Sequence, residues 1–256
     1  MALARQHNLD LAQLPADKLV TEALLRQLIA QGEPVVDQPE IAQYETSALV
    51  IYGGGGHGKS LIDLVRAAGA YIPVCVVDDG LPSGGEVLGV PILGSGAELA
   101  GLYARGARCA VNAVGGIGNL TPRLKVLERL ALAGFTCPVV AHPAAVIEPS
   151  ANLADGVQVF AMAYVGSSAR VGFGCIVNTG AILSHDVVMG AYSNVSPGAM
   201  LAGAVQVGER VLVGMGVTIN LEVKIGSGAR IGNGATVKAD VPPGGVVHAG
   251  TIWPVR

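Results

Sequence analysis

Two short stretches of this sequence carry residue types that could do chemistry. The first is GGGGHGKS, from Gly53 to Ser60. Read as G-x-x-x-x-G-K-[ST], it is a P-loop whose Lys59 would contact a nucleoside triphosphate; read as G-x-G-x-x-G, it is a dinucleotide-binding loop. Asp78 and Asp79 follow further along the chain and could be the acidic partner in either pattern. The stretch predicts a phosphate-containing ligand, although glycines that only make a tight turn remain an alternative.

The second stretch is the pair His185-Asp186. An imidazole can take a proton from a nucleophile near neutral pH, and a carboxylate beside it can orient the ring and raise its basicity. His185 is the only histidine between Ile147 and Pro242. A lone surface histidine is also typical of an ordinary solvated residue, so the pair alone leaves both interpretations open.

The element that must position His185 is a six-residue repeat. From Ile147 to Pro242 the chain divides without a gap into sixteen blocks, each beginning with Ile, Leu, Val or Met and each with Ala, Val, Cys or Ser at its fifth position. This period is typical of a parallel β-helix in which the first and fifth residues point inward. Three blocks per coil predict about five coils, stacked at roughly 4.8 Å. Glycine is frequent at the second position, where we expect it to relieve a turn with positive φ.

The element that must position GGGGHGKS is an α/β unit of about 100 residues. Apolar runs predict strands over 48–52, 71–77 and 109–114, and helical patterns cover 61–65 and 121–133. The glycine loop then lies between a strand and a helix, as a dinucleotide-binding loop requires. The P-loop interpretation is weaker, because no arginine finger or water-positioning residue has a clear context.

Composition excludes several classes of protein. A formal net charge of −3 over 256 residues gives no reason to expect binding to nucleic acid or to an anionic membrane surface. Four widely spaced cysteines without a C-x-x-C motif are typical of reduced thiols in a cytoplasmic protein. Residues 187–208 carry no charge, but Asn194, Pro197 and several glycines interrupt them, so we expect no membrane helix. The N-terminus has no uninterrupted apolar core, which predicts no signal peptide.

The order of motifs resembles one family. Gly-His-Gly-Lys follows a strand, Asp-Asp follows the next, Ala-Val-Gly follows the third, and His142-Pro143 leads into the hexapeptide blocks. This arrangement is similar to that of the acetyltransferases that N-acetylate UDP- or GDP-linked 4-amino sugars, whose close relatives are the sialic acid O-acetyltransferases. The resemblance covers about residues 47 to 250 and implies a left-handed β-helix, a homotrimer and acetyl-CoA as co-substrate, without a metal. We therefore expect a helical extension over 1–46, with an amphipathic helix at 16–31, a Rossmann-like nucleotide-sugar-binding domain over 47–145 and a β-helix acetyltransferase domain over 146–256.

The resemblance also implies roles for particular residues. It implies that Gly55, Gly56 and His57 of the glycine loop contact the sugar and diphosphate. It also implies that Asp78 and Asp79 recognise the base or ribose, and that Gly115 lines the same cleft. In the blocks it makes His185 the general base, Asp186 its helper and the Gly203 amide an oxyanion donor, and it places Asn194, Met215 and Asn233 along coenzyme A. Two features depart from the family: Asn194 stands where histidine is frequent, and the C-terminal HAGTIWPVR replaces the usual Gly-x-Pro-Ala.

These implications predict an acetyl-CoA-dependent N-acetyltransferase acting on the 4-amino group of a nucleotide-linked amino-dideoxy sugar. O-acetylation of sialic acid or another sugar is an alternative, and a non-catalytic trimeric β-helix binding protein is a remote one. A zinc carbonic anhydrase of the β-helix type would need three histidines on the coils, and the blocks contain only His185.

Overall fold

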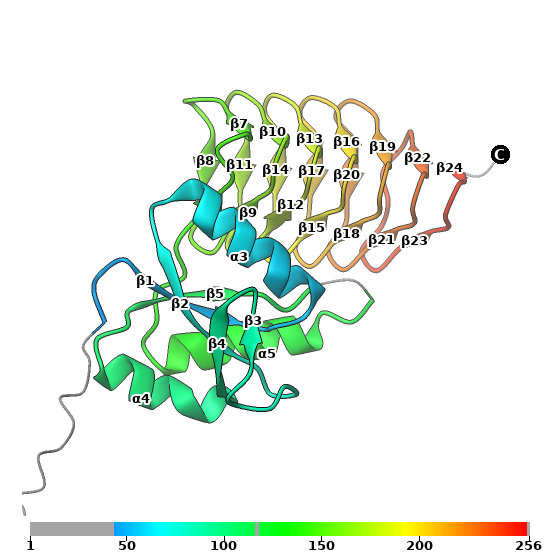
Figure 1. Ribbon diagram of the computed structural model, residues 1–256. Helices are drawn as coiled ribbons and strands as arrows, with labels where there is room; N and C mark the ends of the chain where they lie inside the picture. Colours follow the sequence, from blue (N-terminus) through cyan, green and yellow to red (C-terminus); the bar gives the residue numbers. More distant parts are fainter. Residues whose placement is uncertain (1–43, 116–117, 255–256) are drawn as a thin grey trace, which may run out of the picture. The chain divides into compact units, whose positions relative to one another are not determined.

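The computed structural model describes residues 44–115 and 118–254 (Figure 1). The helix expected at 16–31, with nearly all of the expected extension 1–46, lies outside the described residues. An N-terminal α/β unit comes first and a β-helix follows it, so the predicted fold class is confirmed. No helix in 44–115 and 118–254 combines the length and apolarity needed to cross a bilayer.

The N-terminal unit is built on a five-stranded sheet with the order β3-β4-β2-β1-β5. Strands β1, β2, β4 and β5 are parallel, and β3 forms an antiparallel hairpin with β4. The predicted strands and the predicted helix over 121–133 are confirmed to within two residues, whereas the β3–β4 hairpin and α4 were not predicted. The bounds are β1 Ala48–Tyr52, α3 Gly56–Ala68, β2 Ile72–Val77, β3 Glu86–Val87, β4 Val90–Gly94, a 3-10 turn Gly96–Glu98, α4 Leu99–Ala104, β5 Cys109–Asn112 and α5 Thr121–Leu132.

The central strand β1 is buried on both faces, which explains its uninterrupted apolar sequence. Leu49 and Ile51 point to the face covered by α3, and Val50 and Tyr52 point to the face covered by α4 and α5. Full burial of such an aliphatic side chain contributes roughly 1.5–3 kcal/mol, so this alternation fixes the layers of the unit.

The β-helix consists of three parallel sheets. Sheet 1 has the order β6-β9-β12-β15-β18-β21-β23, sheet 2 the order β7-β10-β13-β16-β19-β22-β24, and sheet 3 the order β8-β11-β14-β17-β20. Their bounds are β6 Val140–Ala141, β7 Val146–Ile147, β8 Asn152–Leu153, β9 Gln158–Val159, β10 Tyr164–Val165, β11 Arg170–Val171, β12 Ile176–Val177, β13 Ile182–Leu183, β14 Val188–Met189, β15 Asn194–Val195, β16 Met200–Leu201, β17 Gln206–Val207, β18 Leu212–Val213, β19 Thr218–Ile219, β20 Lys224–Ile225, β21 Arg230–Ile231, β22 Thr236–Val237, β23 Val246–Val247 and β24 Ile252–Trp253.

The coils of this left-handed β-helix stack with a step of 18 residues, as Ile182 paired with Met200 illustrates. The first and fifth residues of the blocks form one continuous buried core, which confirms the predicted inward positions. Figure 1 shows the coils stacked along one axis, from β7 to β24. Sheets 1 and 2 each have seven strands, more than the predicted five coils provide.

The predicted role of the second-position glycines is wrong. Positive φ occurs at the fourth position of the blocks, for example at Gly180 (φ 64°) and Asp186 (φ 60°). At the second position the next coil comes too close for a side chain, since a Cβ on Gly190 would lie 2.6 Å from the Glu209 nitrogen. Glycine is therefore required there by coil stacking rather than by backbone conformation.

The last predicted block, from Val237 to Pro242, has its first and fifth residues buried as predicted, but its step to the previous coil differs. Val241 forms a parallel bridge with Ile225 and is buried, so the turn after Val237 is two residues short. The period then resumes in a shifted frame, with Val247 paired to Ile231 and Trp253 paired to Val237. The sequence repeat ended at Pro242 because of this two-residue shift, not because the β-helix ends there.

Sheet 1 is the side of the β-helix that packs against the N-terminal unit. Phe160 and Ile176, next to or in strands of sheet 1, belong to the same core as Leu61 and Ile62 of α3. From the other side of the unit, Arg123 of α5 donates a hydrogen bond of 2.8 Å to the Gly174 carbonyl. Because three sheets enclose the β-helix, the edge between sheets 2 and 3 lies opposite sheet 1.

Candidate functional site

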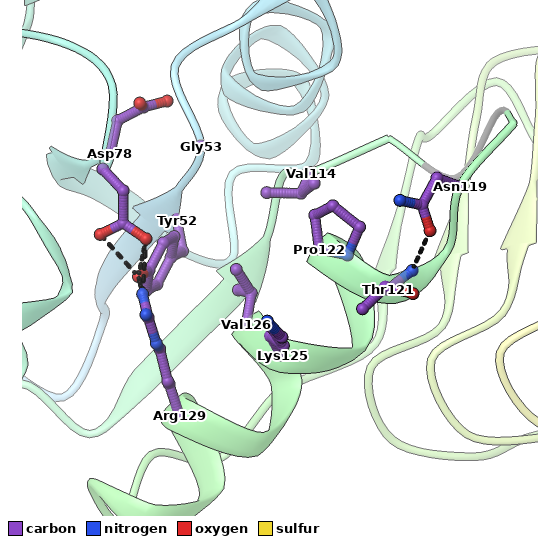
Figure 2. A pocket seen from close by; sticks show the side chains of 11 residues that line it. Tyr52, Gly53, Asp78, Val114, Asn119, Thr121, Pro122, Lys125, Val126 and Arg129 are labelled. Carbon is purple, nitrogen blue, oxygen red and sulfur yellow. Dashed lines mark hydrogen bonds and ion pairs between the residues drawn. The ribbon is translucent and has the colours of Figure 1, made fainter.

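A cavity of about 460 Å³ opens where β1, β2 and β5 end (Figure 2). This is the edge where open α/β sheets bind ligands, at the point where strand order reverses around β1. Figure 2 shows α5 forming one wall, with Lys125 and Arg129 on it. The lining residues are Tyr52, Gly53, Asp78, Asp79, Val114, Asn119, Thr121, Pro122, Lys125, Val126 and Arg129.

Asp78 lines this cavity, but its carboxylate is used to shape the backbone. Its Oδ2 accepts a hydrogen bond of 2.7 Å from the Gly54 N–H, and its Oδ1 accepts bonds from Gly80 (2.8 Å) and Leu81 (3.2 Å). The side chain thus ties the glycine loop after β1 to the turn after β2.

Asp79 is held in a second network. Its Oδ1 accepts a hydrogen bond of 2.9 Å from the Gly96 N–H, and its Oδ2 pairs with Nη1 of Arg129. The same Nη1 donates to the Tyr52 hydroxyl at 2.7 Å, and Figure 2 shows Arg129 reaching from α5 toward Tyr52. The Gly96 N–H and the Arg129 guanidinium hold the pKa of Asp79 below its ordinary value, so this carboxylate stays ionised.

His57 lies in the first turn of α3, between the glycine loop and sheet 1. Its Nε2 is 2.9 Å from Gln158 Oε1, its ring packs at 5.4 Å from the Phe160 ring, and Gln158 Nε2 donates to the Asn112 carbonyl at 2.8 Å. Because the Gln158 amide group already donates, its oxygen must accept, which places the His57 proton on Nε2 and leaves Nδ1 as an acceptor. Burial lowers the pKa of His57, so the ring is neutral at neutral pH.

The glycines of the loop fall into two kinds. Gly58 must be glycine, since a Cβ there would lie 2.1 Å from the Gly53 carbonyl oxygen. Gly55 and Gly56 are exposed at the N-terminus of α3, with open space where a side chain would be, so their amides are accessible to an anion. Gly115, just after β5, lies beside His57, whose Cβ is 3.9 Å from the position of a Gly115 Cβ.

His185 and Asp186 lie on the edge between sheets 2 and 3. Adjacent residues on a flat strand would face opposite ways, but Asp186 has φ 60° at the corner of the coil. The corner brings Asp186 Oδ2 to 2.9 Å from His185 Nδ1, and both side chains are more than half exposed. The carboxylate therefore fixes the ring so that Nε2 faces away from it.

Gly203 lies one coil further along, directly against this ring. A Cβ on Gly203 would be 2.5 Å from both Nε2 and Cε1 of His185, so only glycine leaves room for the observed ring position. No residue in the described part of the chain accepts a hydrogen bond from the Gly203 N–H. The amide is thus available beside His185 Nε2.

The three residues predicted to follow coenzyme A lie on or beside sheet 1, away from His185. Met215 and Asn233 line a cavity of about 270 Å³, and the Asn233 side-chain oxygen accepts a hydrogen bond of 3.0 Å from the Met215 N–H. Asn194 is buried in β15, and its Oδ1 has no hydrogen-bond partner among the described residues.

Within one chain, the predicted site residues other than the three on the coenzyme A path therefore form two groups. Those of the glycine loop and the cavity lie at the N-terminal unit, which covers sheet 1, whereas His185, Asp186 and Gly203 lie on the opposite edge of the β-helix. A ligand held in the cavity cannot reach His185 of the same chain through the β-helix core.

Sequence reasoning missed the cations of α5. Lys125 and Arg129 line the cavity, and the buried Arg123 donates to the Val114 and Gly174 carbonyls. Burial lowers the pKa of Arg123 to about 10, which leaves it charged below the cavity at neutral pH. The available signal was the helix register, because Lys125 and Arg129 are four residues apart and share one face.

The described residues contain no cluster of side chains that could bind a metal ion. No group of three His, Cys, Asp or Glu side chains lies within reach of one ion in 44–115 and 118–254. The cysteines among these residues are unpaired, and burial raises the pKa of Cys75 to about 12 and that of Cys175 to about 11.

Comparison with known proteins agrees with this architecture. Residues 48–130 match the family model of the PglD N-terminal domain. A perosamine N-acetyltransferase variant from Caulobacter crescentus, solved with CoA and GDP-perosamine, is 34% identical with a TM-score of 0.74 over 78% of this chain and 93% of that chain. The acetyltransferase domain of PglB from Neisseria gonorrhoeae, solved with acetyl coenzyme A, is 33% identical with a TM-score of 0.74 over 82% and 100%. WeeI from Acinetobacter baumannii is 26% identical with a TM-score of 0.71 over 78% and 95%.

Proposed function

Since the chain belongs to the hexapeptide-repeat family of sugar acetyltransferases, we propose that it transfers an acetyl group from acetyl-CoA to the 4-amino group of a nucleotide-linked amino-dideoxy sugar. The observation that carries this proposal is the similarity to an N-acetyltransferase solved with both CoA and a nucleotide sugar, which extends over 93% of that N-acetyltransferase chain. The cavity at the ends of β1, β2 and β5 supports it, because that cavity lies beside the glycine loop and has Lys125 and Arg129 among its lining residues, together with Asp78 and Asp79.

In the proposed reaction His185 acts as general base. Asp186 accepts a hydrogen bond from the Nδ1–H of the ring, so the lone pair of Nε2 is free to take a proton from the attacking amine. The nitrogen then bonds to the thioester carbonyl carbon, and in this proposal the Gly203 N–H stabilises the oxygen that gains charge. When the carbon–sulfur bond breaks, the proton on Nε2 passes to the leaving thiolate, and His185 returns to its starting form.

The cradle for the nucleotide sugar is proposed at the glycine loop and α5. The accessible amides at Gly55 and Gly56 suit the diphosphate, and Lys125 adds a positive charge across the cavity. His57 is neutral and therefore acts through the Nδ1 lone pair, which suits a hydroxyl or ammonium group of the sugar rather than a phosphate.

Two experiments separate this cradle from a P-loop. His57→Ala should raise the KM for the sugar nucleotide by several-fold and leave the KM for acetyl-CoA nearly unchanged. Lys59→Ala should retain acetyl transfer, and calorimetry with ATP and magnesium should show no specific binding. Micromolar ATP binding that Lys59→Ala abolishes would establish the P-loop instead.

A homotrimer is proposed because one chain separates the cavity from His185. A neighbouring copy could bring its own edge between sheets 2 and 3 to the cavity, and a three-fold ring closes such a head-to-tail contact. The outer face of sheet 2 supports burial against another copy, since it exposes Val146 (56%), Met200 (44%) and Ile252 (56%). Light scattering should give three times the chain mass, and an active monomer would refute this assembly.

The acetyl transfer itself is tested by coenzyme A release against a panel of UDP- and GDP-linked 4-amino-dideoxy sugars, with sialic acids alongside. His185→Ala should lower turnover by about 10² or more, the usual contribution of a general base, while Asp186→Asn should lower it less. His142→Ala is the matched control, because His142 lies outside the proposed site. Full turnover in His185→Ala would refute the mechanism, and release with sialic acid alone would establish O-acetylation.

A further inference from the structure

Three cavities follow one another along the side of the chain that carries sheet 1. The nucleotide cavity shares Asn119 with a second cavity of about 420 Å³, and this second cavity shares Leu212 and Arg230 with the cavity that contains Met215. The middle cavity has no role in the site described above. It lies between the loop before α5 and the coils that carry Arg210 and Arg230.

The polar side chains that line the middle cavity can donate hydrogen bonds. Arg210 and Arg230 line it from successive coils, and no Asp or Glu is among its lining residues. The nearest carboxylate oxygen to Arg210 in a described residue is that of Glu209, which lies 3.8 Å from Nη2, beyond hydrogen-bond distance. Arg230 forms no ion pair with another described residue.

Two neutral groups add to this donor set. The Asn119 side-chain oxygen accepts a hydrogen bond of 2.9 Å from the Thr121 N–H, which leaves its NH₂ group to donate. The Ser227 oxygen accepts a bond of 3.1 Å from the Glu209 N–H, which leaves its hydroxyl proton to donate. Both groups line the cavity with the two guanidinium groups.

We infer that the Arg210–Arg230 cavity binds a phosphate group of one of the two co-substrates. A guanidinium offers a planar pair of donors that fits two oxygens of a phosphate. Arg230 has no ion pair among the described residues and the Arg210–Glu209 pair is as long as 3.8 Å, so both guanidinium groups keep donors for an anion. The position supports both sources, because the nucleotide cavity adjoins on one side and the predicted coenzyme A residues adjoin on the other. This inference rests on the proposed function for the identity of the ligand, but not for the presence of the anion site.

Calorimetry on the full chain tests the site without turnover. The probes are coenzyme A, 3′-dephospho-coenzyme A and UDP, and the variants are Arg210→Gln and Arg230→Gln. A charge-assisted hydrogen bond contributes about 1.5–3 kcal/mol, so each variant should weaken one probe by roughly 10-fold or more. Arg170→Gln is the control, because Arg170 is exposed on sheet 3, lines none of the three cavities and has the same charge.

The probes whose binding is weakened by the arginine variants identify which co-substrate supplies the phosphate. Weaker coenzyme A binding with unchanged 3′-dephospho-coenzyme A binding assigns the 3′-phosphate, weaker binding of both coenzyme A forms assigns the coenzyme A diphosphate, and weaker UDP binding alone assigns the sugar nucleotide. Arg230→Lys, which keeps the charge without the planar fork, should recover part of the affinity. Equal losses for all three probes, or affinities equal to those of Arg170→Gln, would overturn the site.

The proposed function can fail separately. If the wild-type protein binds neither coenzyme A nor UDP, the proposed function is wrong, and inorganic pyrophosphate then tests the cavity alone. Pyrophosphate binding that Arg230→Gln removes and Arg170→Gln retains would support the anion site, and no pyrophosphate binding would overturn it.

Discussion

Gly203→Ala isolates the contact between two coils that holds the His185 ring. The new Cβ would lie 2.5 Å from Nε2 and Cε1, whereas ordinary contact begins at 3.4 Å, so the ring must move by about the 0.9 Å difference. Gly203 does not have a positive φ, and the substitution keeps its N–H, so backbone strain and the loss of an oxyanion donor are both avoided. The ring can move because its side chain is 63% exposed.

A displacement of about 1 Å at a reacting group can cost roughly 10²-fold in rate. We therefore expect Gly203→Ala to lower kcat for coenzyme A release by about this factor, with the melting temperature within a few degrees of wild type. The double variant with His185→Ala is the decisive control, because a change that acts only through the ring has no further effect once the ring is gone. A kcat equal to wild type, or an additional loss of the same size in the His185→Ala background, would refute this reasoning.

Three further expectations concern stability and reactivity. Gly190→Ala should lower the free energy of unfolding by more than Gly180→Ala. The new Cβ at residue 190 would lie 2.6 Å from the Glu209 nitrogen, whereas at residue 180, with φ 64°, it would meet open space; equal chemical denaturation midpoints would contradict this. Burial raises the pKa of Cys75 to about 12 and that of Cys175 to about 11, so iodoacetamide at pH 8 should label these thiols only after denaturation, as mass spectrometry can check. Burial lowers the pKa of His57 below 6.5, so on acidification the unfolded chain takes up its proton first and the free energy of unfolding should fall below about pH 6.5; this fall should be shallower in His57→Gln.

The fold was largely predictable because its signals are local and repeated. The inward positions of the β-helix follow from the identity of the first and fifth residues of each block, and the strand β1 follows from its apolar run. The second-position glycines were misassigned because their constraint is not local: Gly190 must be glycine owing to a backbone one coil later in the chain. The two-residue shift at Val241 was missed for the same reason, since only its bridge to Ile225 reveals the new frame.

The candidate site was predictable in position but not in how its groups are used. The sequence placed Asp78, Asp79 and His57 at the edge of the sheet, yet it could not show that backbone amides occupy Asp78, that Arg129 and Tyr52 hold Asp79, or that Gln158 fixes the His57 tautomer. Each of those partners is distant in the chain or belongs to another element, so no local pattern records it.

The separation between His185 and Asn194 could have been derived from the period alone. Coils repeat every 18 residues, as the pairing of Ile182 with Met200 shows, so residues 185 and 203 must stack, while residue 194 lies half a coil away on another sheet. A base at His185 and a contact at Asn194 can therefore meet on one substrate only when two chains supply them. The spacing thus favours a site shared between two chains before any interface is considered. The position of the N-terminal unit on sheet 1 favours it independently, because it separates the cavity from His185 of the same chain.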